Sequence, residues 1–224
     1  MQHVLECAKR LLATTAIIFA ATITNAQNIE YSKADSTKVV SLLKEATTLR
    51  GNTHPMIYFG RKFIGYPYVA HTLERGDKEH LIVNLRQFDC TTFVETVTAL
   101  TLCDQRNQRT FADFCHNLAT LRYRQGKISD YTSRLHYFTW WATDNEQLGI
   151  IKDIAPQQEP WGAFTAVQRI NINYMSNHAS AYKHLLACPD YLPVIKKMEQ
   201  DCNGKQYRYI PKDNLRWSAD SSLG

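Results

Sequence analysis

The sequence predicts an α+β fold in which helices outnumber strands. Apolar residues recur at helical spacing in many segments, whereas short β-branched runs are few. Apolar side chains make up 44% of the 224 residues, which is enough for a substantial core, and no repeat or low-complexity linker divides the chain. These observations fit one domain, or one domain with an added lobe.

The N-terminus has the parts of a secretory signal. Lys9 and Arg10 precede an apolar run from Leu11 to Ile23, and Thr24-Asn25-Ala26 supplies a small residue for cleavage. This run is shorter than the roughly 20 residues that span a membrane. We therefore expect a signal peptide at residues 1–26, a mature chain beginning near Gln27, and a periplasmic or secreted protein without stable membrane insertion.

Charge and cysteine usage exclude several classes of protein. The net charge of +5 falls to about +4 without the signal and is spread evenly, which argues against nucleic-acid binding. The sequence contains no Cys-x-x-Cys pair, so we expect neither a zinc ribbon nor a thioredoxin-like site. Five cysteines remain after residue 26, so at least one thiol stays free in an oxidising compartment. The pairing among Cys103, Cys115, Cys188 and Cys202 is left open.

The first half of the mature chain contains two predicted helices and a strand. Residues 36–50 form an amphipathic helix with Ser36 as N-cap and Gly51 as its stop. Pro55 occupies the first position of the next helix, which Gly65 closes. The apolar run at residues 81–85 is short and β-branched at its centre, and we expect a strand there.

The second half is predicted to be mainly helical. Helices are expected at residues 90–103, 110–123, 134–147, 176–187 and 193–202, and strands at 150–154 and 207–210. Phe93, Val94, Val97 and Leu100 would form the buried face of the first of these helices. The three tryptophans Trp140, Trp141 and Trp161 are interpreted as core residues, and the three histidines His54, His80 and His184 as surface residues.

Cys90 is the residue with the clearest chemical potential. It begins a predicted helix, with Asp89 or Thr92 as a possible cap and Thr92 and Glu95 spaced as a capping box. Unpaired amides and the helix dipole favour a thiolate at this position, which is a nucleophile for acyl transfer. The amide of Cys90 could also stabilise the oxyanion. The simpler alternative is an apolar residue in the first turn of a buried helix.

Two motifs argue against that simpler alternative. Residues 68–74 read Tyr-Val-Ala-His-Thr-Leu-Glu, and residues 89–95 read Asp-Cys-Thr-Thr-Phe-Val-Glu. Together with shorter matches at residues 81–86, 133–138 and 209–211, they resemble the N-acetylmuramoyl-L-alanine amidase-like family of the NlpC-type papain-like cysteine hydrolases. This resemblance covers nearly all of the mature chain.

The resemblance implies a fold, a reaction and a set of site residues. The fold would be a papain-like core with a helical lobe from about Thr110 to Asn203. The reaction would be hydrolysis of the N-acetylmuramoyl-L-alanine bond in muropeptides or peptidoglycan fragments, with no metal or cofactor. Cys90 would be the nucleophile, and residues that bind substrate or the oxyanion would be Tyr68, Arg134, His136 and His178.

The sequence departs from the family pattern at its end. Family members continue beyond the Ile-Pro strand into a Gly-Asp strand and a His-x-Gly strand that carries the catalytic histidine, whereas residues 212–224 contain no histidine. We therefore expect an incomplete β-barrel part in a C-terminally truncated chain. Two alternatives stay open, namely an inactive protein or remnant that binds muropeptides, and a structural exported protein whose thiols are all paired or buried.

Overall fold

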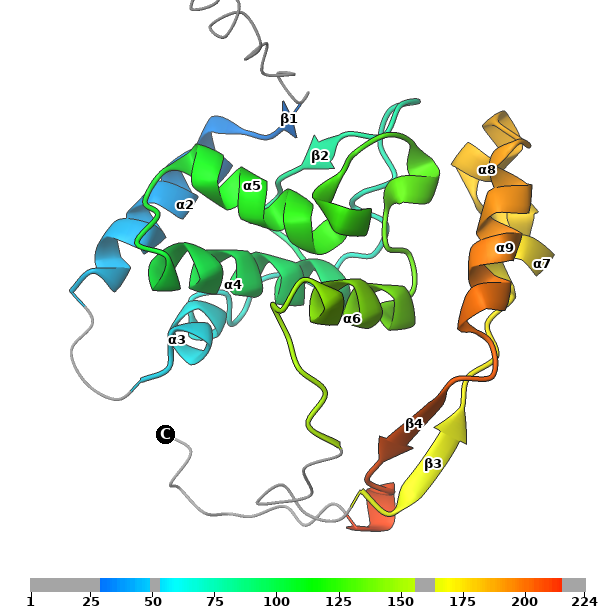
Figure 1. The fold of residues 1–224 in the computed structure, drawn as a ribbon. Helices are drawn as coiled ribbons and strands as arrows, with labels where there is room; N and C mark the ends of the chain where they lie inside the picture. The colour runs from blue at the N-terminus through cyan, green and yellow to red at the C-terminus, as the bar shows by residue number, and fades with distance from the viewer. Residues whose placement is uncertain (1–28, 49–52, 156–163, 215–224) are drawn as a thin grey trace, which may run out of the picture.

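The computed structural model describes residues 29–48, 53–155 and 164–214, and they form a helix-rich α+β fold (Figure 1). The main body contains α2 (Lys33–Ala46), α3 (Pro55–Arg61), α4 (Cys90–Gln105), α5 (Phe111–Arg122) and α6 (Phe138–Gln147). Helices α2, α3 and α5 pack on α4, whose Val97, Ala99, Leu100 and Cys103 are buried. The predicted α+β class, with helices outnumbering strands, is confirmed, whereas the papain-like core stays a prediction.

Strands contribute little to the fold. β1 (Ile29–Glu30) pairs in parallel with β2 (Leu81–Ile82), in the register Ile29 to Leu81. β3 (Ala166–Arg169) pairs antiparallel with β4 (Gln206–Tyr209), with Val167 opposite Arg208. The strands predicted at residues 81–85 and 207–210 are thus present, the first one shorter than expected, while β1 and β3 were not predicted.

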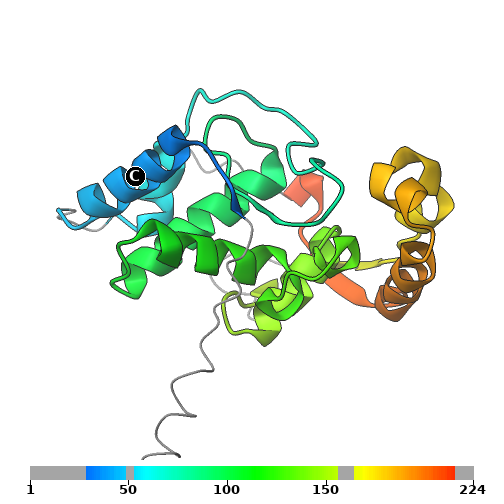
Figure 2. The same ribbon diagram turned by 90° about the horizontal axis from the view of Figure 1, so that it is seen from above.

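A C-terminal arm, residues 166–209, stands to one side of the main body in both views (Figures 1 and 2). It consists of the antiparallel pair β3–β4 and, between these strands in the chain, the helices α7 (Tyr174–Asn177), α8 (Lys183–Ala187) and α9 (Tyr191–Cys202). The expected helical lobe is therefore smaller than residues 110–203, because α5 packs along α4 and belongs to the main body.

Capping and local hydrogen bonds explain most corrections to the predicted elements. The N-cap of α2 is Ser32, four residues before the expected cap, because Ser32 and Asp35 form a capping box one turn earlier. α6 begins at Phe138 rather than Arg134, since Arg134 pairs with Tyr123 and the Leu135 amide donates to Arg122 O at 2.9 Å. Val94 is 42% exposed rather than buried, and it lines an apolar groove of about 380 Å³ between α3 and α4.

Two predicted elements differ more strongly. Residues 150–154 form no strand, and the Ile150 amide instead donates to Asn145 O at 2.9 Å, which caps α6. The helix expected at residues 176–187 is broken into α7, a 3-10 turn and α8, because His178 leaves the helical conformation. The predicted signal peptide and Trp161 lie outside the described residues. Within the described residues, no helix is long and apolar enough to cross a membrane.

Asp35 connects α2 to the segment that leads into α4. Its side chain is 1% exposed and accepts hydrogen bonds from the Ser32 hydroxyl and from the Leu85 amide, at 2.6 and 2.9 Å. Burial opposes ionisation of this carboxyl, but these hydrogen bonds and the nearby Arg86 outweigh it and lower the pKa of Asp35 below 3.8. The ionised carboxylate therefore stabilises the fold at neutral pH.

We expect Asp35→Asn to lower the free energy of unfolding at pH 6 by about 1–3 kcal/mol, because a buried acceptor is replaced by an amide. The contribution of Asp35 is complete above its ordinary pKa of 3.8 and disappears as the pH falls through the lower folded value. Urea unfolding at pH 6 and pH 2.5 should thus show a smaller difference at the acidic pH. Asp190→Asn, at an exposed position, is the control; equal differences at both pH values would contradict the assignment.

Candidate active site

The N-terminus of α4 is fixed by a reciprocal cap between Asp89 and Thr92. The Thr92 amide donates to Asp89 Oδ1 at 2.8 Å, and the Asp89 amide donates to Thr92 Oγ1 at 2.9 Å. The capping box expected between Thr92 and Glu95 is therefore absent. Cys90 is the first residue of α4, its thiol is free, and its side chain is exposed. The predicted position of Cys90 at a helix start is confirmed.

The loop that contains Tyr68 and His71 lies beside this helix start. The Val69 amide donates to Phe88 O at 2.8 Å, and the Phe88 amide donates to Pro67 O at 3.0 Å. These hydrogen bonds hold the loop two residues before Cys90. Tyr68 is 72% exposed here, so its ring is available to a ligand.

A cavity of about 150 Å³ opens between this loop and the first turns of α4. Its wall combines polar residues from the loop, from α4, from the end of α5 and from the segment before α6. The lining residues are His71, Thr72, Leu73, Glu74, Asp89, Thr91, Thr92, Glu95, Arg122, Arg134, Leu135 and His136. We call it the Thr91 cavity, because Thr91 directly follows Cys90.

A buried ion pair between Arg122 and Glu95 forms part of this wall. Arg122 Nε donates to Glu95 Oε2 at 2.7 Å, and Arg122 Nη1 donates to Ile82 O at 2.6 Å. Both side chains are no more than 3% exposed. Burial raises the pKa of Glu95, and the Arg122 charge opposes this rise. The pair joins α4, α5 and β2 at the base of the site.

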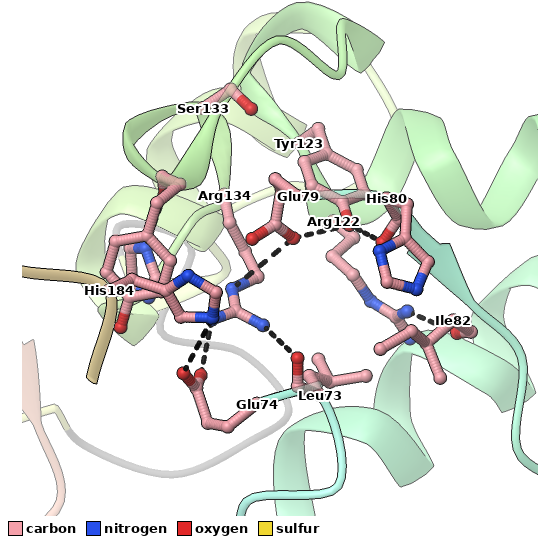
Figure 3. A network of polar contacts seen from close by, with 12 residues as sticks. Leu73, Glu74, Glu79, His80, Ile82, Arg122, Tyr123, Ser133, Arg134 and His184 are labelled. Carbon is pink, nitrogen blue, oxygen red and sulfur yellow. Dashed lines mark hydrogen bonds and ion pairs between the residues drawn. The ribbon is translucent and has the colours of Figure 1, made fainter. Parts of the chain in front are cut away.

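Arg134 holds the loop on the other side of the Thr91 cavity (Figure 3). Its guanidinium donates to Leu73 O at 3.1 Å and to Glu74 Oε1, and its Nε lies 3.8 Å from Glu79 Oε1. Burial raises the pKa of Glu79, while the pKa of Arg134 is also raised, because the carboxylates outweigh its desolvation. With its donors engaged in this way, Arg134 positions the loop, and direct substrate binding by it stays a prediction.

His136 lines the same cavity, but its ring is already engaged. Nε2 lies 2.7 Å from Tyr131 O, and the ring lies 4.3 Å from that of Tyr131. Burial and the Arg134 charge lower the pKa of His136 to about 3. The imidazole is therefore neutral at physiological pH and poorly suited to accept a proton.

The remaining predicted histidines lie elsewhere. His178 is exposed on the C-terminal arm, where Nδ1 lies 3.0 Å from Tyr174 O, and it does not line the Thr91 cavity. His184 was expected at the surface but is 4% exposed, because it stacks on Tyr131 and faces Glu74 at 3.8 Å (Figure 3). His80 is partly buried and hydrogen bonded to Glu30, while His54 is exposed and caps α3.

The described cysteines differ strongly in environment. All five are free thiols, and Cys103, Cys115 and Cys202 are buried. Burial raises the pKa of Cys103 to about 11 and that of Cys115 to about 12, which keeps both thiols protonated. Cys90 is the exposed member of this group and Cys188 is partly buried. The alternative in which every thiol is paired or buried is thus wrong for the described cysteines.

Sequence reasoning missed several residues of the site, and each had a weak signal. Arg122 falls one residue after Leu121 on the inward face of α5, where a charge requires a buried partner. Glu74, Glu95 and His71 lie within the two quoted motifs, but nothing local shows that they share a cavity. Within the described ranges, no group of three or more metal-ligating side chains is assembled.

Comparisons with known proteins agree with the geometry. The profile of the N-acetylmuramoyl-L-alanine amidase-like family matches residues 58–223. No curated protein sequence matches the chain. The family match includes the Tyr68 loop, α4, the Arg134 segment and the C-terminal arm.

Several crystal structures share the fold. An N-acetylmuramoyl-L-alanine amidase from Bacteroides uniformis has 40% identity and a TM-score of 0.65, over 72% of this chain and 66% of that chain. A Bacteroides fragilis protein described as a candidate xylanase has 39% identity and a TM-score of 0.64, over 71% and 67% of the two chains. A Legionella pneumophila protein has 22% identity and a TM-score of 0.58, which indicates the fold alone. The chain thus spans about two thirds of the length of the first two.

We expect Cys90 to be the first thiol modified by iodoacetamide, because it is exposed at a helix N-terminus whereas Cys103 and Cys115 are buried. Limited labelling of the native protein followed by peptide mapping measures this order. Cys188 is the internal comparison, since it is partly exposed but lies on the arm. Modification of Cys188 or Cys202 before Cys90 would contradict the nucleophile assignment.

Proposed function

Because the chain belongs to the N-acetylmuramoyl-L-alanine amidase-like family, we propose that it is a cysteine amidase that hydrolyses the N-acetylmuramoyl-L-alanine bond of muropeptides. The observation that carries this proposal is the exposed Cys90 thiol at the capped start of α4, beside the Thr91 cavity. A nucleophile at a helix N-terminus and a polar cavity next to it are two of the parts that acyl transfer requires.

The reaction follows from the position of the thiol. The Cys90 sulfur, once it has lost its proton, attacks the lactyl carbonyl carbon, and the Cys90 amide at the start of α4 would stabilise the resulting oxyanion. The carbon–nitrogen bond then breaks, the L-alanyl nitrogen takes up the proton that the thiol lost and leaves as an amine, and a lactyl thioester remains on Cys90. Water hydrolyses the thioester, which releases the muramic acid carboxylate and restores the thiol.

The wall of the Thr91 cavity suits a peptide-like substrate. The charges of Arg122 and Glu95 neutralise each other, as do those of Arg134 and Glu74, so the wall offers both donors and acceptors without a large net field. A muropeptide amide has one donor and one acceptor and could use both kinds of group. Its saccharide could contact the exposed ring of Tyr68.

A glycosidase reaction is less well supported. Glycoside hydrolysis generally uses two carboxyl groups on either side of the scissile bond. In this site Asp89 caps α4, Glu95 pairs with Arg122, and Glu74 pairs with Arg134. These carboxylates already have partners, whereas the exposed Cys90 thiol has no role in a glycosidase.

One observation favours a muropeptide-binding protein without activity. In the part of the chain that the structure describes, the only side chain within hydrogen-bond reach of the Cys90 sulfur is Thr91, at 4.0 Å, and no histidine contacts it. A thiol without a base would bind substrate but turn it over slowly. Binding and hydrolysis must therefore be measured separately.

We further propose that the protein is exported and meets this substrate in the periplasm or outside the cell.

We expect Cys90→Ala to reduce hydrolysis of a muramoyl-L-alanyl peptide at least about 100-fold, because loss of a nucleophile removes the covalent step. The released peptide amine is measured by chromatography and binding by calorimetry, and binding should change little. Cys188→Ala is the matched control. Undiminished hydrolysis by Cys90→Ala would refute the cysteine mechanism, while binding without hydrolysis by the wild type would support the binding protein.

A further inference from the structure

The C-terminal arm contacts the loop of the candidate site. We call residues 68–77 the site loop, since four of them line the Thr91 cavity, namely His71, Thr72, Leu73 and Glu74. Two consecutive residues of α8, Lys183 and His184, reach the last part of this loop. The arm therefore touches the segment that forms one wall of the cavity, although neither residue of α8 lines the cavity itself.

Lys183 holds the turn at the end of the site loop. Its Nζ donates to Gly76 O at 3.0 Å and lies 3.2 Å from Asp77 Oδ1. Gly76 has a φ of +67°, in the left-handed region that glycine adopts most readily, which allows the chain to turn here. The side chain of Asp77 is 94% exposed, so its ion pair contributes little. The hydrogen bond to the turn is therefore the main contact of Lys183.

His184 faces a carboxylate of the cavity wall. Its Nε2 lies 3.8 Å from Glu74 Oε2, while Glu74 Oε1 accepts from Arg134 (Figure 3). The imidazole of His184 is buried, and its ring stacks on that of Tyr131 with 4.7 Å between the centroids. The two oxygens of Glu74 thus have partners in two parts of the molecule, one in the segment before α6 and the other in the arm.

The charges in this cluster favour a protonated His184. Glu74 and Glu79 both face the guanidinium of Arg134. When both carboxylates are ionised, they exceed the guanidinium by one negative charge, which a protonated imidazole would neutralise. The described titratable and charged groups that contact His184 or its partners are Glu74, Asp77, Glu79, Tyr131, Arg134, His136, Tyr182, Lys183 and Tyr191. Among them His136 stays neutral, because burial lowers its pKa to about 3.

We propose that α8 is a clamp on the site loop, with Lys183 and His184 as positioning residues; its kinetic consequence rests on the proposed amidase function. Lys183 fixes the turn at Gly76. Protonated His184 fixes Glu74, and through Glu74 it fixes the cavity wall. Such residues act through the geometry in which a substrate is held, and they need no contact with the reacting atoms. Docking of the arm thereby sets how well the Thr91 cavity holds its ligand.

Hydrogen exchange of the full chain tests the clamp without a substrate. The variants are Lys183→Met and His184→Gln, and the matched control is His178→Gln, which changes an exposed histidine of the same arm. Exchange is measured by mass spectrometry at pH 6 and pH 8 and corrected for the intrinsic rate at each pH. Peptides from the site loop report on the clamp, and peptides from α2 report on the stability of the main body.

We expect the site loop to exchange at least about fivefold faster in Lys183→Met and, at pH 6, in His184→Gln, while α2 and the control stay unchanged. At pH 8 the effect of His184→Gln should shrink, because histidine generally loses its charge between pH 5 and 8, whereas that of Lys183→Met should persist. Unchanged exchange of the site loop would overturn the inference. Equally faster exchange in α2 would do so as well, since it would show a general loss of stability.

Kinetics on a muramoyl-L-alanyl peptide test the consequence for the reaction. We expect His184→Gln to raise KM about fivefold at pH 6 and to leave kcat within about twofold of the wild type, because the clamp orders a binding wall rather than the thiol. A lower kcat with an unchanged KM would contradict the positioning role. If Cys90→Ala hydrolyses normally, the proposed function fails, but the exchange measurement still decides whether α8 holds the site loop.

Discussion

The buried guanidinium of Arg134 is the interaction on which the candidate site depends. It lies between Glu74, Glu79 and Leu73 O, and its side chain is 5% exposed. A buried charge that loses its partners is strongly destabilising, so the loop that supplies these acceptors cannot move away at low cost. The same loop carries Tyr68 and His71 past the start of α4. Arg134 therefore fixes one wall of the Thr91 cavity, while the Val69 and Phe88 hydrogen bonds hold the loop beside Cys90.

Buried ion pairs and side-chain hydrogen bonds, rather than an extended sheet, connect the segments around the candidate site. β1 and β2 have two residues each, which is too short to align the surrounding segments through backbone hydrogen bonds alone. Arg122 instead joins Glu95 of α4 to Ile82 O of β2, and Tyr123 donates to Glu79 and to His80 O at 2.8 Å (Figure 3). Consecutive residues at the end of α5 thus anchor the segment between residues 79 and 82. This arrangement explains why polar side chains are buried around a site that has little regular strand structure.

The sequence predicts those parts of the fold that depend on local signals. α3 begins at Pro55 and α5 follows Thr110 as expected, since capping and apolar spacing are encoded within one or two turns. The errors arise where distant residues decide. Arg134 is extended because it pairs with Tyr123, and residues 150–154 lack a partner strand despite their β-branched composition. For the site, the motif identifies Cys90 and Tyr68, whereas the contacts of Glu74 with Arg134 and His184 join residues 60 and 110 positions apart. No local pattern could predict such contacts.

Glu74 couples the candidate site to the C-terminal arm. Its Oε1 accepts from Arg134, and its Oε2 faces His184 of α8 at 3.8 Å. His184 in turn stacks on Tyr131, whose ring also contacts His136 and Arg134. The arm makes further polar contacts, among them Glu199, which accepts from Tyr137 at 2.6 Å, and Lys183, which donates to Gly76 O at 3.0 Å. Because one carboxylate serves both the cavity wall and the arm, displacement of α8 would leave Glu74 with fewer constraints on its position. The geometry of the cavity is therefore a property of the main body and the arm together, although the arm contributes no residue to its lining.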